Sequence, residues 1–304
     1  MCSNGWRSQE RWRRVRGEGG EEGDGGNWGD TPLPTLTPLT SPSSPTNSTF
    51  TLVTRIEKQI ANMRTDHIKD LGKILFLDIE TVPEVYDFGK LDERGAKLFS
   101  DKTRFEQERS GKTAEELYGD KGGIFSEFGK VVCIGVGGLK REEDGHALRV
   151  TSFHGDDERD VLQRFVDLLN KSYNTDDHWL CGHNGKEFDF PWIARRCIVH
   201  RIKLPKLLDV GGLKPWEVGF IDTMNMWSFG DRKNFTSLGL LTHLLGIPTP
   251  KDDISGADVA RVYYEEHDLE RIATYCKKDV VATAQLYLRL KGEAAVREEH
   301  IALV

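Results

Sequence analysis

The stretch KILFLDIETVPE, residues 73–84, restricts what this chain can fold into more than any other part of the sequence. Its four consecutive apolar residues, 74–77, predict a strand that is buried on both faces of a sheet. Two acids, Asp78 and Glu80, follow directly and flank Ile79. Because side chains at positions i and i+2 of a strand lie on the same face, both carboxylates are expected together at the strand's end. They are either a solvated strand end or part of a site that requires two acids.

The hydrophobic pattern after this strand alternates between strands and helices. The charged residues 84–128 are expected to be mostly helical, and polar turns separate the elements that follow. We expect strands at 130–139, 147–155, 178–184 and 218–227, and helices at 156–173, 190–201, 237–246 and about 268–290. Strands that come first and then alternate with helices predict an α/β fold, in which helices cover a mixed sheet.

The first 62 residues differ in composition from the rest of the chain. They are rich in glycine and then in proline, threonine and serine, and such a segment cannot build a packed core. Met63 stands just before the first orderly segment. We therefore expect residues 1–62 to be a disordered extension or a mis-assigned stretch of coding sequence. Residues 63–304 would then form one α/β domain, with a core at about 70–292.

Charge and cysteine content exclude several classes of protein. The formal net charge of −7 argues against broad binding along duplex nucleic acid, which normally leaves a basic footprint. The five cysteines are widely spaced and contain no C-x-x-C pair, which favours a reducing, cytoplasmic location over a disulfide framework or a zinc ribbon. No apolar run approaches the roughly 18 residues of a membrane span.

Two further acids stand at places where an acid requires an explanation. Asp279 falls on the apolar arc of the last long helix, with Tyr275 one turn before it, and an acid there is costly unless it is paired or bound to a cation. Asp189 follows a short strand and precedes a helix, so it is either a helix N-cap or an acid at the carboxyl edge of the sheet. With Asp78 and Glu80 these acids form the oxygen-rich set that Mg²⁺ or Mn²⁺ requires.

The segments that contain these acids resemble the motifs of a known family. DIET, NGKEFD and YCKKD occur in the order of the three motifs of the DEDD 3'-5' exonuclease superfamily, and the spacing Tyr-x-x-x-Asp is that of its tyrosine subclass. The form FLDIET is most similar to the proofreading exonuclease domains of B-family DNA polymerases and to the stand-alone exonucleases related to them. The resemblance covers residues 70–292. It implies an RNase H-like fold with a mixed β-sheet flanked by helices on both faces. Residues 84–128 depart from the family pattern, because they form a helical insertion that is longer than the tight hairpin of a minimal domain.

The resemblance also implies an activity and a role for each motif residue. A 3'-5' exonuclease of this kind releases nucleotides from the 3' end of single-stranded DNA by phosphodiester hydrolysis with two divalent ions, Mg²⁺ or Mn²⁺. Asp78 would bridge both ions, Glu80 and Asp279 would complete the ion on the side of the nucleophile, and Asp189 would hold the second ion. Tyr275, with a reference pKa of about 10, would stay neutral and orient the attacking water.

Substrate contacts are expected close to these acids. The resemblance implies that Asn184 contacts the terminal nucleotide. Further candidates for phosphate contacts and base stacking are Lys186, Phe188, Phe190, Trp192 and Lys251, of which Phe190 and Trp192 are equally suited to a core. Single-stranded nucleic acid suits the net charge better than duplex, and the DIET form favours DNA over RNA. Two alternatives stay open: an exoribonuclease of RNase-D-like activity, and an inactive module that binds a 3' end without cutting it.

Overall fold

The computed structural model describes residues 70–143, 145–214, 217–231, 235–248 and 254–304, all within one compact unit, Ala61–Val304. The predictions for residues 1–62 and for Lys251 lie outside the described residues. The helices are α2 (Glu93–Ser110), α3 (Ala114–Lys121), α4 (Glu158–Ser172), α5 (Asp189–Val199), α6 (Thr223–Ser228), α7 (Leu238–Leu245), α8 (Val259–Arg261) and α9 (Leu269–Lys291). The strands are β1 (Ile74–Pro83), β2 (Gly129–Glu142), β3 (Gly145–His154), β4 (Trp179–Gly182), β5 (Ile221–Asp222) and β6 (Ile301–Leu303). Single turns are η2 (Leu71–Lys73), η3 (Phe88–Lys90), η4 (Val262–Glu266) and η5 (Glu298–His300).

The six strands form one mixed sheet in the order β5-β4-β1-β2-β3-β6. Strands β1, β2 and β3 pair antiparallel, β4 and β5 continue the sheet parallel to β1, and β6 pairs parallel with β3. Three successive antiparallel strands, extended on the β1 side by two parallel ones, are the RNase H-like arrangement. The predicted mixed α/β fold is therefore confirmed.

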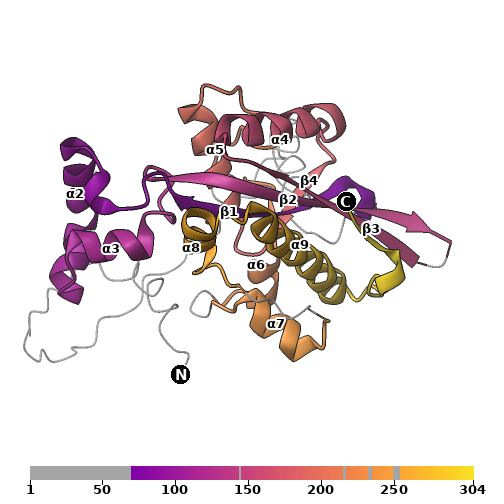
Figure 1. Ribbon diagram of the computed structural model, residues 1–304. Helices are drawn as coiled ribbons and strands as arrows, with labels where there is room; N and C mark the ends of the chain where they lie inside the picture. Colours follow the sequence, from indigo (N-terminus) through magenta and orange to yellow (C-terminus); the bar gives the residue numbers. More distant parts are fainter. Residues whose placement is uncertain (1–69, 144, 215–216, 232–234, 249–253) are drawn as a thin grey trace, which may run out of the picture. The chain divides into compact units, whose positions relative to one another are not determined.

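The central strand β1 is buried on both faces, and each face has its own core. Leu75 and Leu77 belong to the cluster that includes residues of α4 and α5, whereas Ile74 and Phe76 belong to the cluster on the α9 side. Figure 1 shows α4 and α5 on one side of the sheet and α6, α7 and α9 on the other. Because side chains alternate along a strand, the even-numbered acids of β1 lie on the α9 face.

Glycines in β2 allow α9 to lie directly on the sheet. A Cβ atom at Gly135 would come within 2.9 Å of the Cys276 sulfur, and one at Gly137 within 2.8 Å of a Val280 methyl group. Any larger residue at either position would push the helix away from the strand. The segment GVGG therefore serves close helix packing, and it lets the first half of α9 lie beside the middle of β1, where Gly135 pairs with Asp78.

The expected strand at 218–227 is wrong for most of its length. Only Ile221–Asp222 is a strand, and the helix α6 begins at Thr223. The cause is the Asp222 side chain, which accepts hydrogen bonds from the backbone N–H groups of Met224 and Asn225 and so caps a helix. The apolar residues that follow belong to this helix rather than to a longer strand.

The segment 84–128 contains two helices and a small core of its own. Phe99, Leu117 and Tyr118 are the buried members of that core. The Trp192 indole of α5 donates a hydrogen bond to the Ile124 carbonyl at 2.9 Å, which ties the segment to the sheet domain. The two helices agree with the prediction that residues 84–128 are mostly helical. The domain limits of 63–304 and 70–292 stay predictions.

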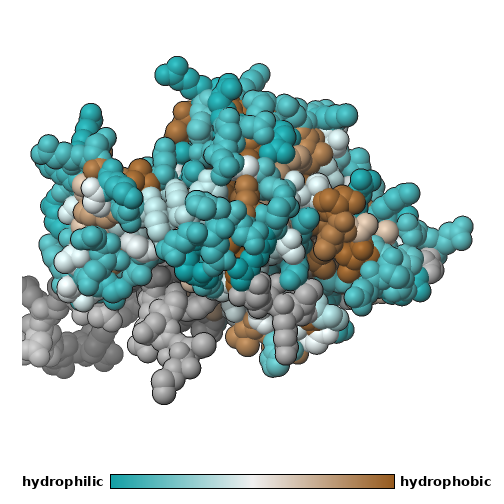
Figure 2. All heavy atoms as spheres, in the orientation of Figure 1, coloured by the Kyte–Doolittle hydropathy of each residue, from teal (hydrophilic) through white to brown (hydrophobic). Residues whose placement is uncertain are grey.

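Hydrophilic residues predominate on the face shown in Figure 2, where hydrophobic ones gather in separate patches. The exposed large hydrophobic side chains belong to several elements, among them Leu98 on α2 and Leu240 and Leu244 on α7. Among the described helices, none combines the length and the apolar composition that crossing a membrane requires.

Candidate functional site

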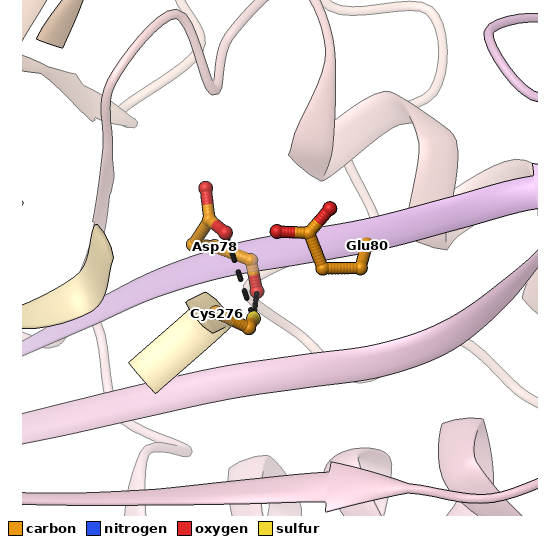
Figure 3. Close-up of side chains that lie close together, drawn as sticks. All are labelled: Asp78, Glu80 and Cys276. Atoms are coloured by element: carbon orange, nitrogen blue, oxygen red, sulfur yellow. Dashed lines mark hydrogen bonds between the residues drawn. The ribbon is translucent and has the colours of Figure 1, made fainter. Parts of the chain in front are cut away.

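Two carboxylates and a thiol meet on the α9 face of β1. Asp78 and Glu80 project from the same side of the strand, and Figure 3 shows them next to each other, with the sulfur of Cys276 beside Asp78. One potential ligand atom from each of the three residues lies within 4.8 Å of the others. The pairing of β1 with β2 shifts between Glu80 and Thr81. Such an irregularity is common beside active sites, because it redirects the side chains near it.

Asp189 is held against β1 between these two acids. It is the first residue of α5 and is 4% exposed, and its Oδ1 accepts a hydrogen bond from the backbone N–H of Ile79 at 3.1 Å. The N-cap position of α5 belongs to Phe188. The N-cap interpretation of Asp189 is therefore wrong, since the carboxylate binds the neighbouring strand 110 residues away in sequence.

Helix α9 brings its polar residues to the same place. Cys276 donates its thiol hydrogen towards the Asp78 carbonyl oxygen at 3.4 Å and the Asp78 Oδ2 at 3.5 Å, which holds the helix beside the middle of β1. Tyr275 forms a side-chain hydrogen bond with Asp279. Asp279 is also close enough to raise the pKa values of both Asp78 and Glu80 by charge repulsion. The three predicted motifs thus converge on one site.

Burial and mutual repulsion make these carboxyls poor anions in the metal-free protein. Burial is the main cause that raises the pKa of Asp78, and the charges of Glu80, Asp279 and Asp189 raise it further. The pKa of Glu80 is raised for the same reasons, with Asp279 as the strongest neighbouring charge. Burial raises the pKa of Asp189 to about 7, although hydrogen bonds from backbone amides oppose the shift. The site therefore favours the binding of positive charge.

Ion pairs do not supply that positive charge within the described part of the chain. Asp78, Glu80 and Asp189 form no ion pair there with a lysine, arginine or histidine, although neighbouring helices carry many such residues. Oxygen donors that converge in a buried place without a cationic partner fit a hard divalent ion. The chemistry of the donor set is thus compatible with the metal ions that the motifs imply.

Burial also raises the pKa of Tyr275, the tyrosine of the third motif. Together with the neighbouring charges of Asp279, Glu80 and Asp78, it raises the pKa of Tyr275 well above the usual tyrosine value. The phenol is therefore neutral at any physiological pH. It can donate a hydrogen bond, and it cannot act as a base.

The candidate substrate residues differ in their exposure: two lie in a half-buried loop, and the aromatic ones pack in or against the core. Asn184 and Lys186 lie in the half-buried loop between β4 and α5, where Asn184 has a left-handed backbone with φ 62°. Phe188 packs against the core on the α4 and α5 side. Phe190 and Trp192 are fully buried in the same core and are unsuited to base stacking.

Sequence reasoning missed two residues of this region. Cys276 stands three residues before Asp279 on the last long helix, and this spacing is the signal that could have placed it at the site. Asp222 is a buried acid at the end of β5, and it raises the pKa of Asp189 through its charge. Asp222 follows apolar residues, Phe220 and Ile221, as Asp78 follows the apolar residues 74–77, and that repeated pattern could have identified it.

Comparison with known proteins gives a family and two relatives. A family model described as "Predicted 3'-5' exonuclease related to the exonuclease domain of PolB" matches residues 125–300, more than half of the chain. The matched part contains Asp189, Tyr275 and Asp279 and begins after Asp78 and Glu80.

Both relatives are much longer than this chain. A DNA polymerase of Pyrococcus glycovorans is 24% identical over 142 residues, in a match that covers 42% of this chain and 18% of the polymerase. Among solved structures, the family B DNA polymerase of Pyrobaculum calidifontis matches with a TM-score of 0.47 and 19% identity, over 72% of this chain and 24% of the polymerase chain. The chain thus spans less than a quarter of the length of either relative.

Proposed function

The chain belongs to the family of predicted 3'-5' exonucleases related to the exonuclease domain of PolB, and we propose that it removes nucleotides from the 3' end of single-stranded DNA with the help of two divalent metal ions. The observation that carries this proposal is the convergence of Asp78, Glu80 and Asp189, three carboxylates with raised pKa values and no ion-pair partner in the described part of the chain. A protein that only binds a nucleic acid would gain nothing from acids that repel phosphate.

Each residue of the site has a role in the proposed reaction. Asp78, Glu80, Asp189 and Asp279 would hold Mg²⁺ or Mn²⁺, which lower the pKa of water and stabilise the attacking and leaving oxygens of a phosphoryl transfer. The Ile79 amide keeps the Asp189 carboxylate turned towards β1. Cys276 keeps α9, and with it Tyr275 and Asp279, beside Asp78.

DNA is proposed because the family is related to a DNA polymerase domain and the curated relative is itself a DNA polymerase. A single strand is proposed because the net charge of −7 is unsuited to a long duplex footprint. A strand end, in contrast, requires only a few phosphate and base contacts near the acids.

The direct test is an assay of the full chain on oligonucleotides labelled at the 5' end. We expect a ladder of products shortened from the 3' end on single-stranded DNA with Mg²⁺ or Mn²⁺, and intact strands with EDTA. Matched RNA and duplex DNA are the comparison substrates. Degradation in EDTA would exclude the metal-dependent mechanism, and faster degradation of RNA would support the exoribonuclease alternative. Binding without any cleavage would support the inactive 3'-end-binding module.

Tyr275→Phe tests the role of the phenol without removing its ring. We expect kcat to fall between about 10-fold and 100-fold with a nearly unchanged KM, because the hydroxyl orients water and does not itself bind the ions. Steady-state kinetics on single-stranded DNA measure both constants. Tyr173→Phe, a matched change at the end of α4 on the other face of the sheet, should have wild-type constants. A wild-type kcat in Tyr275→Phe would show that the hydroxyl takes no part.

A further inference from the structure

Asp222 makes more hydrogen bonds than a helix cap requires. Its carboxylate is 3% exposed, and Oδ1 accepts from the backbone N–H groups of Met224 at 2.9 Å and Asn225 at 3.3 Å, which completes the cap of α6. The same carboxylate accepts two more amides from the loop after β4. The N–H of Asn184 donates to Oδ1 at 3.1 Å, and the N–H of Lys186 donates to Oδ2 at 3.1 Å. One buried side chain thus joins two segments that are 36 to 38 residues apart.

The loop that Asp222 holds has a conformation that needs support. Asn184 has φ 62°, a left-handed conformation that asparagine adopts more readily than most other residues with a side chain. At Gly185 a Cβ atom would come within 2.8 Å of the Phe190 ring, so the loop is also packed tightly from behind. Two amides bound to a buried carboxylate stabilise this turn, because leaving them unpaired would cost their desolvation.

A second contact fixes the same loop from the start of α6. The His183 Nδ1 accepts a hydrogen bond from the Thr223 hydroxyl, with the atoms 2.9 Å apart, and its Nε2 donates to the Thr236 carbonyl at 2.9 Å. Burial lowers the pKa of His183, which agrees with a neutral ring that both accepts and donates. Asp222 and Thr223, at the start of α6, therefore hold the loop at His183, Asn184 and Lys186.

The held loop leaves its polar side chains available. Within the described part of the chain, the side-chain amide of Asn184 makes no hydrogen bond and the ammonium group of Lys186 makes no ion pair. Both residues are half-buried, and the loop leads directly to Asp189. Asn184 and Lys186 thus place an amide and a cation on the loop that leads to the buried Asp189. The amide suits the sugar and base groups of a nucleotide, and the cation suits its phosphate.

From this arrangement we propose that Asp222 is a positioning residue, which sets the loop 183–187 so that Asn184 and Lys186 bind the terminal nucleotide of the substrate. The inference rests on the proposed exonuclease function. Asp222 acts through the loop and does not itself touch the substrate. Its effect should therefore fall on substrate binding rather than on the chemical step.

Asp222→Asn tests the positioning role of Asp222 by replacing one carboxylate oxygen with an NH₂ group. The asparagine oxygen can still accept from Asn184, Met224 and Asn225, so the cap remains, but its NH₂ group faces the Lys186 N–H and cannot accept from it. We expect KM for single-stranded DNA to rise roughly tenfold while kcat stays within about threefold of wild type. Asp157→Asn is the matched control, since Asp157 caps α4 through the amides of Arg159 and Asp160, both within its own helix.

Asp222→Glu separates position from charge. It keeps the negative charge near Asp189 but moves the carboxylate oxygens, so a rise in KM as in Asp222→Asn supports positioning. A wild-type KM in both variants would overturn the proposal. It would also be overturned if Asp222→Asn lowered only kcat and Asp222→Glu had a wild-type kcat, because the charge would then matter and the position would not. Thr223→Val, which loses the His183 contact and keeps Asp222, should raise KM in the same direction.

Hydrogen–deuterium exchange gives a readout that does not depend on catalysis. The Lys186 amide should exchange faster in Asp222→Asn than in wild type, while the amides of β1 keep their protection. If the wild-type chain cleaves no labelled strand, the proposed function fails, and exchange still tests whether Asp222 holds the loop. Unchanged exchange at Lys186 would overturn that part directly.

Discussion

Replacement of Asp78 or Asp279 by alanine is expected to abolish nucleotide release, with a loss of roughly 10³-fold or more in kcat/KM. The reason is that divalent ions contribute several kcal/mol to the transition state of a phosphoryl transfer, and about 1.4 kcal/mol corresponds to a factor of ten. Each replacement removes one carboxylate from the group of acids that would hold the ions. Burial already opposes the charged forms of Asp78 and Glu80 in that group. Rates on labelled single-stranded DNA measure the loss. Wild-type activity in Asp279→Ala would refute the assignment of the third motif.

The same acids should oppose folding when no metal ion is bound. Asp78→Asn removes one of several carboxylates that repel one another at the site, while it keeps the shape of the side chain. We therefore expect the metal-free variant to melt about 3 °C higher than wild type. Mn²⁺ should raise the Tm of the wild-type protein, because a ligand that binds only the folded state stabilises it, and should raise that of the variant less.

Thermal melting with EDTA and with added Mn²⁺ measures both effects independently of activity. Asp209→Asn, a change at an exposed acid, is the matched control and should behave as wild type in both conditions. A variant that melts like wild type without metal, and gains as much from Mn²⁺, would show that Asp78 does not contribute to a metal site.

The acids of the site were predictable because each follows from a short local pattern. The alternation of side chains in a strand places Asp78 and Glu80 on one face, and the helical period places Asp279 beside Tyr275. The structure brings Asp189 against β1 through the Ile79 amide. Asp78 and Glu80 lie inside β1, which continues to Pro83, and not at the strand's end as the sequence predicted. The roles assigned to these residues stay predictions.

Other features depend on contacts that no local pattern reveals. Whether Asp222 continues a strand or caps a helix is decided by amide donors, two of which come from a loop 36 to 38 residues away. The apolar residues around Asp222 therefore led to the incorrect prediction of a strand at 218–227. Burial of Phe190 and Trp192 depends on the sheet behind α5, and their aromatic character alone suits a core and a binding surface equally. Tertiary contacts, rather than propensity, settle such cases.

The second large effect concerns stability and follows from a buried ion pair under α5. The Arg196 guanidinium is 3% exposed, and it donates to the Glu158 carboxylate through Nε at 2.9 Å and through Nη2 at 2.6 Å. Its Nη1 donates to the Ser126 carbonyl at 3.1 Å. Glu158 is 5% exposed and also accepts from the Val131 amide and from His200. One pair thus connects α4, α5 and the end of the inserted segment.

Arg196→Met should lower the free energy of unfolding by about 3 to 5 kcal/mol, because it leaves the Glu158 carboxylate buried without its arginine. For a domain of this size that corresponds to a fall in Tm of roughly 10 °C. Chemical denaturation, followed by tryptophan fluorescence, measures the change. Arg164→Met is the matched control: Arg164 pairs with Asp160 on the exposed face of α4, where an ion pair contributes about 1 kcal/mol or less.

The double variant Glu158→Gln with Arg196→Met distinguishes a buried unpaired charge from lost packing. Removing both charges should cost clearly less than the sum of the two single changes, since neither partner is then left as an isolated ion. Additive losses would instead show that the arginine acts mainly by filling space. Because α5 begins at Asp189, a loosened helix should also weaken metal binding at the acids, so the Mn²⁺-induced rise in Tm should be smaller in Arg196→Met than in Arg164→Met.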